Sequence, residues 1–333
     1  MAAIASTKRN LDVGRDVGPL RIGVIGSVNR DSIASVDGSV RRSLGGALYT
    51  ALALAHLGGD RVEAQLVSRV GADVVDEIDY WIGRCPPLRS EGLLTQESPN
   101  YHCQIQYRAD DGKTEILSGS LEPLNPDELR PLISRLDGLL VNFITGFELD
   151  LETMAALRRE TRGTVLIDIH SLTLGRADSG ERFWRRPDNW QDWISLADVV
   201  QMNEDEAAVL GDIDGSEADE LSEFALSTLR LGPKGAVVTR GQKGGVAAWR
   251  DAEAGSTEVF EFSAPDPHLA VDSTGCGDVF LAAMGLATLG GERFPQAVAI
   301  AARAAAANSR LRGIEQLEAL PHVFHSEIER KVT

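Results

Sequence analysis

Cysteine is scarce in this 333-residue chain, which holds only Cys85, Cys103 and Cys276. Three cysteines, odd in number and widely spaced, make neither a zinc cluster nor a disulfide framework. This usage is typical of a reducing compartment, so we predict a cytoplasmic location. The N-terminal residues 1–19 carry charges but lack an apolar signal-peptide core, and we expect them to be a disordered tail.

Positive charge is also in short supply, because 33 Lys and Arg face 50 Asp and Glu and give a net charge of −17. A surface that binds nucleic acid or an anionic membrane needs a basic face, so we expect neither as a partner. A small anionic substrate is still allowed, since it needs only a local site. No apolar run approaches the roughly twenty residues of a membrane span.

Two common nucleotide-binding motifs are missing. The predicted first strand, 20–26, is not followed by the Gly-x-Gly-x-x-Gly spacing of dinucleotide-binding folds. Gly112-Lys113-Thr114 is similar to the end of a P-loop, but Tyr107 stands where the upstream glycine is required. Residues 101–117 instead have the pattern of a β-hairpin, two strand-like runs joined by a turn that ends in Gly112.

Short apolar runs alternate with helical patterns along the rest of the chain. A mostly parallel sheet covered by helices on both faces, a three-layer α/β/α fold, is the arrangement that this alternation predicts. We expect one domain over 20–320, followed by a C-terminal tail at 321–333. Polar residues and glycines follow several predicted strands, at the sheet edge where ligands bind in such folds. The predicted strands of this sheet are 20–26, 62–70, 139–144, 165–168, 199–202 and 236–239.

The segment 272–278, Asp-Ser-Thr-Gly-Cys-Gly-Asp, precedes a predicted helix at 279–289. Gly275 and Gly277 flank Cys276, so the backbone can curl and aim its N–H groups at one anion. The positive end of the helix dipole reinforces such a site. Asp278, which ends the turn, suits a base that removes a hydroxyl proton while the turn binds a transferring phosphoryl group. An aspartate favoured at a helix start by the dipole is the alternative.

Three further groups of polar residues and glycines are candidates for a site. Asn29 and Asp31 follow the first predicted strand, where ligands bind in open α/β sheets. The pair Gly45 and Gly46 precedes a helix and allows close approach of a ligand. For both groups ordinary turn chemistry is the alternative. Asn203 and Glu206, three apart at a helix start, can face one side, but a helix cap with a solvated glutamate explains them equally.

With these motifs in this order, the chain resembles the PfkB/ribokinase family of small-molecule kinases. The family signature Asp-Thr-x-Gly-Ala-Gly-Asp corresponds to 272–278, and the matching motifs extend over about residues 21–313. The resemblance implies a ribokinase-like fold with a small β-sheet lid, for which 32–42 and 101–117 are the candidates. These segments could also form a homodimer interface.

The resemblance also implies a role for each candidate residue. Asp278 would be the general base, and Gly275, Cys276 and Gly277 would form the anion hole. The hydroxyl acceptor would bind at Asn29, Asp31, Gly45, Gly46 and Thr50, and ATP at Asn203, Thr239, Gly241 and Gly244. Glu206 would orient Mg²⁺ through water, because Mg²⁺ keeps much of its hydration. Asp272 and Thr274 match positions that hold a monovalent cation, such as K⁺, in some members.

Three positions depart from the family pattern. Thr50, next to Tyr49, replaces an asparagine that contacts the sugar, so ribose and fructose 6-phosphate are expected to be poor acceptors. His170 stands where an asparagine is commoner, and either contacts substrate or phosphate or is merely structural. Cys276 replaces alanine, and a thiol at a helix N-terminus could be reactive.

We therefore predict ATP-dependent phosphorylation of a sugar, a sugar derivative or a cyclitol. A nucleoside kinase is the first alternative, with Tyr49 or Tyr101 stacking on the base. A non-catalytic ligand-binding relative is the second, although neither Asp278 nor the glycine turn is lost.

Overall fold

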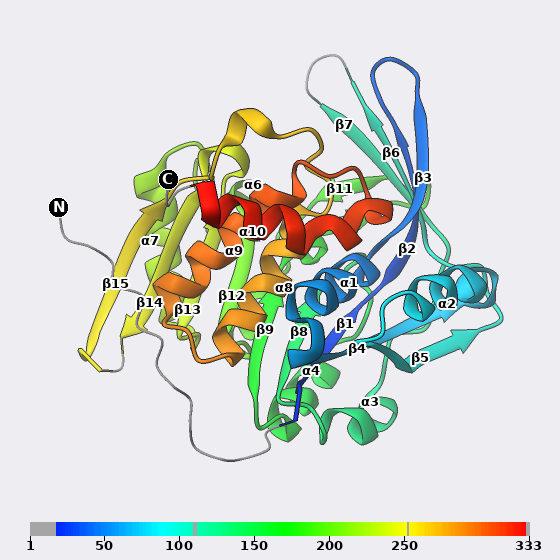
Figure 1. Ribbon diagram of the computed structural model, residues 1–333, viewed down its shortest axis with the longest axis horizontal. Coiled ribbons are helices and arrows are strands. Elements are labelled where there is room, and N and C mark those ends of the chain that lie inside the picture. The colour runs from blue at the N-terminus through cyan, green and yellow to red at the C-terminus, as the bar shows by residue number, and fades with distance from the viewer. Residues whose placement is uncertain (1–17, 109–111, 252, 331–333) are drawn as a thin grey trace.

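The computed structural model describes residues 18–108, 112–251 and 253–330. These residues form a large sheet with helices on both faces and a smaller sheet that projects from this body (Figure 1). The three-layer α/β architecture is as predicted. The tail predicted at residues 1–19 lies almost wholly outside the described residues.

The central sheet has nine strands in the order β15-β14-β13-β12-β9-β8-β1-β4-β5. All neighbours from β13 to β5 run parallel, while β14 and β15 are antiparallel additions at one edge. Apolar strands buried on both faces are typical of a parallel sheet. The strands are β1 (Leu20–Gly26), β4 (Val62–Gly71), β5 (Leu88–Gln96), β8 (Gly138–Asn142), β9 (Thr164–Asp168), β12 (Val199–Asn203), β13 (Gly235–Thr239), β14 (Gly245–Asp251) and β15 (Ser256–Phe262).

Side chains of the central strands alternate between two hydrophobic cores, one on each face of the sheet. In β8, Leu140 joins the first core, while Leu139 and Val141 join the second. The first core contains residues of α1 (Ala47–Gly58), α2 (Val75–Gly83), α8 (Cys276–Leu289) and α9 (Phe294–Asn308). The second contains residues of α3 (Pro126–Ile133), α4 (Leu151–Glu160), α5 (Trp190–Ser195), α6 (Glu204–Gly211) and α7 (Ala218–Leu229).

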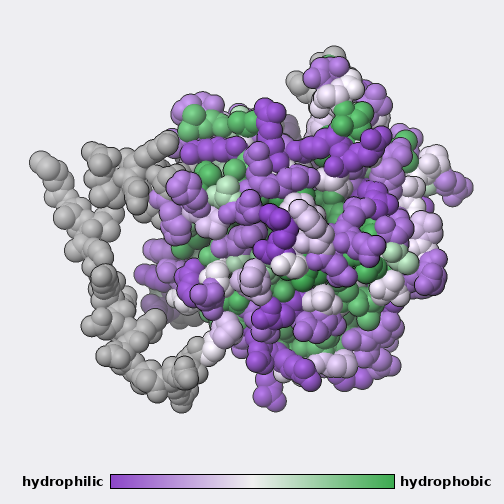
Figure 2. Space-filling view, turned by 45° about the vertical axis from the view of Figure 1, so that its right-hand side comes forward, coloured by the Kyte–Doolittle hydropathy of each residue, from purple (hydrophilic) through white to green (hydrophobic). Residues whose placement is uncertain are grey.

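The smaller sheet has the strand order β3-β2-β6-β7. Its strands are β2 (Val28–Ala34), β3 (Val40–Gly46), β6 (His102–Tyr107) and β7 (Lys113–Ser118). The predicted separate sheet is thus confirmed, and β2 follows β1 after the single residue Ser27. Figure 2 shows it projecting from the body with a mixed polar and apolar surface. Val36 and Val40 are exposed there, but dimerisation through this sheet stays a prediction.

The C-terminal tail predicted from residue 321 is instead helical up to residue 330. Helix α10 (Leu320–Arg330) follows the short 3₁₀ helix η6 (Ile314–Ala319) and places Val323 and Phe324 against the first core. Its sequence alternates apolar and polar residues at helical spacing, which explains this packing. In the part of the chain that the structure describes, none of the helices combines the length and the hydrophobicity that a bilayer span requires.

Candidate active site

Polar residues from neighbouring parallel strands meet at the carboxyl edge of the central sheet. In the strand register Gly26 pairs with Asn142, Asn142 with Asp168, and Asp168 with Gln201. Because parallel strands end at the same edge, this register forms a continuous polar row. The Gln201 side chain donates to Asp168 Oδ2 at 2.8 Å and to the carbonyl of Gly277 at 2.9 Å, and so joins the row to α8.

Asp278 lies in the first turn of α8 with one carboxylate oxygen fixed by two donors. Its Oδ1 accepts from Asn142 Nδ2 at 2.7 Å and from Thr50 Oγ1 at 3.0 Å. Burial raises the pKa of Asp278, although His170 and these two hydrogen bonds oppose the rise. The second oxygen, Oδ2, is left to accept a proton, which suits a general base.

The glycine turn is shaped by the ring of Tyr49. Gly275 has φ 73°, and a Cβ there would overlap that ring, so both conformation and space require glycine. Gly277 is exposed, and a Cβ on it would find no atom closer than 3.8 Å. This open side of the turn is where a phosphoryl group could approach the first N–H groups of α8.

The backbone N–H group and the thiol of Cys276 both have surroundings that the sequence did not predict. Its N–H donates to the Ser273 carbonyl at 3.2 Å, so its share in an anion hole is smaller than that of its neighbours. Burial raises the pKa of the thiol to about 11, and the Sγ faces the Ala305 carbonyl at 3.4 Å. A raised pKa disfavours the thiolate, which is the reactive form, so this environment argues against the expected reactive thiol.

Asn29 and Asp31 lie on β2, and the structure brings Asp31 to the glycine pair. A Cβ at Gly45 would overlap the Asp31 carboxylate, which explains the glycine at this position. Burial, reinforced by repulsion from Asp278 and Glu115, raises the pKa of Asp31 to about 7. Since the charge of Asp278 contributes to this rise, the predicted acceptor residue Asp31 lies in the electrostatic neighbourhood of the candidate base.

Three buried amide oxygens at this edge lack a hydrogen-bond partner. They belong to Asn29, Asn142 and Gln201, which are each at least 95% buried. Buried polar atoms are normally satisfied, so unpartnered ones call for a ligand or bound water. Thr50, by contrast, is fully buried and already bonded to Asp278 and Asn142. It is placed to orient the carboxylate, and stays only a prediction as an acceptor contact.

We expect Asp31→Asn to stabilise the protein above pH 7 and not near pH 4. Between these values the native state keeps a proton that the unfolded chain has lost, so the wild-type unfolding free energy falls as pH rises. An amide removes the buried charge and should add about 1–3 kcal/mol at pH 8. Denaturant unfolding at pH 8 and pH 4 measures this. Asp37→Asn, at an exposed turn, is the control. Lower stability of Asp31→Asn than wild type at pH 8 would contradict the electrostatic explanation.

Asn203 and Glu206 form a capping box at the start of α6. Glu206 N–H donates to Asn203 Oδ1 at 2.9 Å, and Asn203 N–H donates to Glu206 Oε2 at 2.8 Å. These hydrogen bonds confirm the helix cap that was the alternative explanation for this pair. Glu206 is not solvated as that alternative assumed, since it is only 2% exposed. Its Oε1 also lies 3.3 Å from His170 Nδ1. Glu206 therefore has a structural role that does not exclude a second one.

His170 supplies positive charge to this acidic edge. Burial alone would lower its pKa, but Glu206, Asp168 and Asp278 outweigh it and raise the pKa to about 9. The residue adopts φ 31°, a conformation unusual for a non-glycine residue and common at functional sites. Burial and Glu206 in turn raise the pKa of Asp168. A protonated imidazole next to the glycine turn can attract a phosphate.

The residues predicted to bind nucleotide lie at the next strand ends. Asn203 pairs with Thr239 in the register of β12 and β13. Gly241 has φ 52° and open space at its Cβ position, whereas Gly244 is enclosed by the backbone of 262–264 and serves the turn.

The residues predicted to bind Mg²⁺ and those predicted to bind K⁺ have different surroundings. Both Glu206 oxygens are engaged by Asn203, and the described residues contain no cluster of three or more potential metal ligands. This donor set fits Mg²⁺ only through water. The proposed monovalent-cation ligands do not fit K⁺, because the Arg41 guanidinium donates to Asp272 at 2.6 Å and to Thr274 at 3.1 Å.

Sequence reasoning missed four polar residues of this region. Asn142 and Gln201 are polar residues inside apolar strands, and that contrast was the available signal. Arg41 gave no local signal. Arg182 on β11 (Arg182–Trp184) is 9% exposed, and its guanidinium nitrogens lack hydrogen-bond partners. It lies over the Phe147 ring, and Glu115 of β7 is close enough to influence its pKa.

Neither tyrosine suggested as a platform for a nucleoside base is available. Tyr49 is 3% exposed, lies against Gly275 and donates to Asn308 Oδ1 at 2.9 Å. Tyr101 is 4% exposed in the small core under β6 and β7. Both expectations are wrong, because the rings fill the protein interior.

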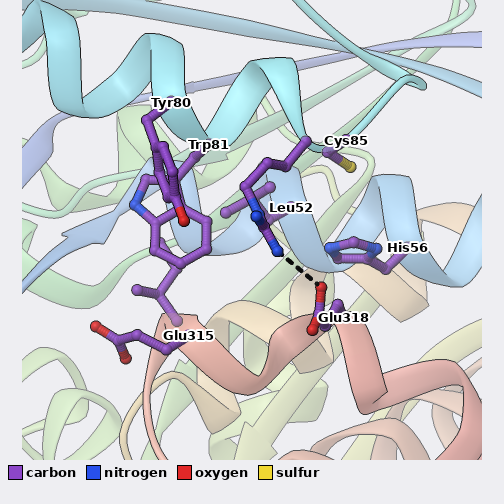
Figure 3. A pocket seen from close by; sticks show the side chains of 9 residues that line it. Leu52, His56, Tyr80, Trp81, Cys85, Glu315 and Glu318 are labelled. Carbon is purple, nitrogen blue, oxygen red and sulfur yellow. Dashed lines mark ion pairs between the residues drawn. The ribbon is translucent and has the colours of Figure 1, made fainter.

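A separate pocket lies between α1, α2 and η6 (Figure 3). It encloses about 270 Å³, and Tyr80 and Trp81 line it together with the ion pair of Arg84 and Glu318. None of the predicted site residues lines this pocket. The candidate active site is therefore the sheet edge and not this hollow.

Comparison with known proteins supports the interpretation of the motifs. Residues 179–316 match the model of the pfkB family carbohydrate kinases. No curated protein sequence matches the chain. The family match includes the glycine turn, Asn203 and the segment 239–244, and it indicates a kinase.

Solved structures with the same fold cover nearly the whole chain. A pyrophosphate-dependent kinase of the ribokinase family, complexed with a pyrophosphate analog and myo-inositol, is 17% identical with a TM-score of 0.73, covering 90% of this chain and 99% of that one. Ribokinase from Thermotoga maritima is 22% identical (TM-score 0.70, 93% and 99% covered). Ribokinase from Arabidopsis thaliana, complexed with ribose and ATP, is 17% identical (TM-score 0.71, 92% and 99% covered). The ribokinase fold is thereby established.

Proposed function

Because the chain has the ribokinase fold and its residues 179–316 match the pfkB carbohydrate kinases, we propose that it phosphorylates a hydroxyl of a small polyhydroxylated molecule with ATP. The observation that carries this proposal is the placement of Asp278. One carboxylate oxygen is fixed by Thr50 and Asn142, and the residue closes the open Gly275–Gly277 turn. The acceptor hydroxyl and the transferring phosphoryl group would thus both lie next to the Asp278 carboxylate.

In the proposed reaction Asp278 Oδ2 accepts the acceptor's hydroxyl proton. The hydroxyl oxygen forms a bond to the γ-phosphorus of ATP, and the bond to the leaving ADP oxygen breaks. N–H groups of the Gly275–Gly277 turn and protonated His170 stabilise the charge on the phosphoryl oxygens. Mg²⁺, carried by the nucleotide phosphates and oriented through water by Glu206, would neutralise charge there.

Acceptor recognition is assigned to β2. Asp31 can accept hydrogen bonds from two hydroxyls, and the unpartnered oxygen of Asn29 can accept a third. The burial of Tyr49 and Tyr101 removes the expected base platform, which favours a cyclitol or sugar derivative over a nucleoside. The unpaired guanidinium of Arg182 makes acceptors with a carboxylate worth testing.

A matched acceptor panel tests the proposal. Ribose, fructose 6-phosphate, myo-inositol, sugar acids and nucleosides would each be assayed with ATP and, separately, with pyrophosphate as donor. We expect a cyclitol or sugar derivative with ATP to have the highest kcat/KM. The highest value for ribose would contradict the role of Thr50, and the highest value for a nucleoside would support the alternative. No transfer to any acceptor would favour a non-catalytic relative.

A further inference from the structure

Arg41 on β3 contacts the two side chains that the family resemblance assigned to a monovalent cation. Its Nη1 lies 2.6 Å from Asp272 Oδ2, and its Nη2 lies 3.1 Å from Thr274 Oγ1. The side chains of both predicted cation ligands thus face a guanidinium. Arg41 and Asp272 are only 32% and 19% exposed at their side chains, so the pair is partly shielded from water.

The environment of Asp272 is that of an ion-paired carboxylate. Burial would raise its pKa, but hydrogen bonds from Thr274 and Arg41 outweigh burial and lower it. Its other oxygen, Oδ1, accepts from the Thr274 N–H at 2.9 Å. The carboxylate therefore holds the start of the 272–278 turn with one oxygen and the arginine with the other.

The backbone around the arginine is also fixed. The Ser309 carbonyl accepts from the N–H groups of Val271 and Asp272, at 2.7 and 3.0 Å. Gly313 has φ 70°, and a Cβ there would come 2.7 Å from Glu315 Oε2 and 3.1 Å from Arg41 Nη1, so the guanidinium lies close to this backbone. The arginine thus fits a space bounded by the turn and by the segment that follows α9.

We propose that Arg41 is a built-in cation that replaces a monovalent metal ion at the glycine turn. A guanidinium carries a permanent charge and aims its donors in a fixed plane, so it can neutralise Asp272 and fix Thr274 without a bound ion. Because Arg41 belongs to β3, the charge that orders the turn comes from the smaller sheet. This is a positioning role, and it rests on the proposed kinase function only for its activity readout.

The first test is the cation dependence of the wild-type protein. Activity and melting temperature would be compared in KCl and choline chloride at equal ionic strength. We expect the two salts to give values within about 1.5-fold for activity and within about 1 °C for melting. Several-fold activation or a clear melting shift by KCl would overturn the proposal.

The second test uses Arg41→Ala, with Arg41→Lys as the charge-conserving variant and the exposed neighbour Arg42→Ala as the control. In choline chloride we expect Arg41→Ala to lose about tenfold or more of its activity and to melt several degrees lower. KCl should restore part of both losses, because the freed oxygens of Asp272 and Thr274 become available to K⁺. Arg41→Lys should stay closer to wild type, and Arg42→Ala should match it.

The melting measurements separate this proposal from the proposed function. If no acceptor is ever phosphorylated, a K⁺-specific rise in melting temperature confined to Arg41→Ala still supports the built-in cation. An Arg41→Ala protein that melts and acts like wild type in choline chloride would overturn it. So would a loss that KCl leaves unrelieved, since Arg41 would then only brace the smaller sheet.

Discussion

Replacing Asp278 by asparagine is expected to lower kcat by about 10²- to 10⁴-fold while nucleotide binding persists. The amide keeps the size of the side chain and can still meet Thr50, but it cannot accept the hydroxyl proton. Steady-state kinetics with a confirmed acceptor, together with calorimetric titration of the nucleotide, would measure both parts.

The pH dependence of kcat/KM tests the role of Asp278 independently. Burial raises the pKa of Asp278, so the carboxylate is protonated at a higher pH than an exposed aspartate. We expect the wild-type kcat/KM to fall as pH decreases through that raised pKa. Asp219→Asn, an exposed change on α7, should leave rate and profile unaltered. Turnover of Asp278→Asn within about threefold of wild type would remove Asp278 from the role of base.

Asp31→Ala is expected to raise the KM for the acceptor by about 10- to 100-fold, with little change in the KM for ATP. Hydrogen bonds to a charged group contribute about 1.5–3 kcal/mol, which corresponds to that range. Asp31 lies on β2 beside Gly45, whereas the predicted nucleotide residue Thr239 ends β13 and Gly241 follows it.

The matched control for this change is Asp37→Ala, in the exposed turn between β2 and β3. It removes a carboxylate from the same sheet without touching the site and should alter neither KM. An ATP KM that rises more than the acceptor KM in Asp31→Ala would show that the two halves of the site are exchanged.

The sheet and the glycine turn could be predicted because their signals are local. Apolar runs of five to seven residues that end in polar ones mark parallel strands, and Gly275 and Gly277 mark a turn at a helix start. The ordered motifs then gave the resemblance to the PfkB/ribokinase family, whose model matches residues 179–316. The hairpin of β6 and β7 followed from a local pattern of about fifteen residues, whereas the smaller sheet as a whole was implied by the family resemblance.

What could not be predicted depends on contacts between distant segments. Asn142 reaches Asp278 across 136 residues, and Arg41 reaches Asp272 across 231. The ring of Tyr49 looked free in sequence but fills the space under Gly275. The reactivity of the Cys276 thiol was mispredicted for the same reason, because its pKa depends on burial against residues of α9 that are distant in sequence. No spacing rule encodes such long-range packing.

The gathering of buried and partly buried carboxylates around the candidate site would affect the lifetime of the protein. Asp31, Asp168 and Asp278 all have raised pKa values because ionised forms are disfavoured there. A bound polyol would donate hydrogen bonds to Asp31 and relieve part of that strain, so the occupied form resists local opening better than the empty one. Proteases cut chains that open, and the empty enzyme would therefore be degraded first. The amount of enzyme in a cell would then follow the supply of its own acceptor, without any dedicated regulator.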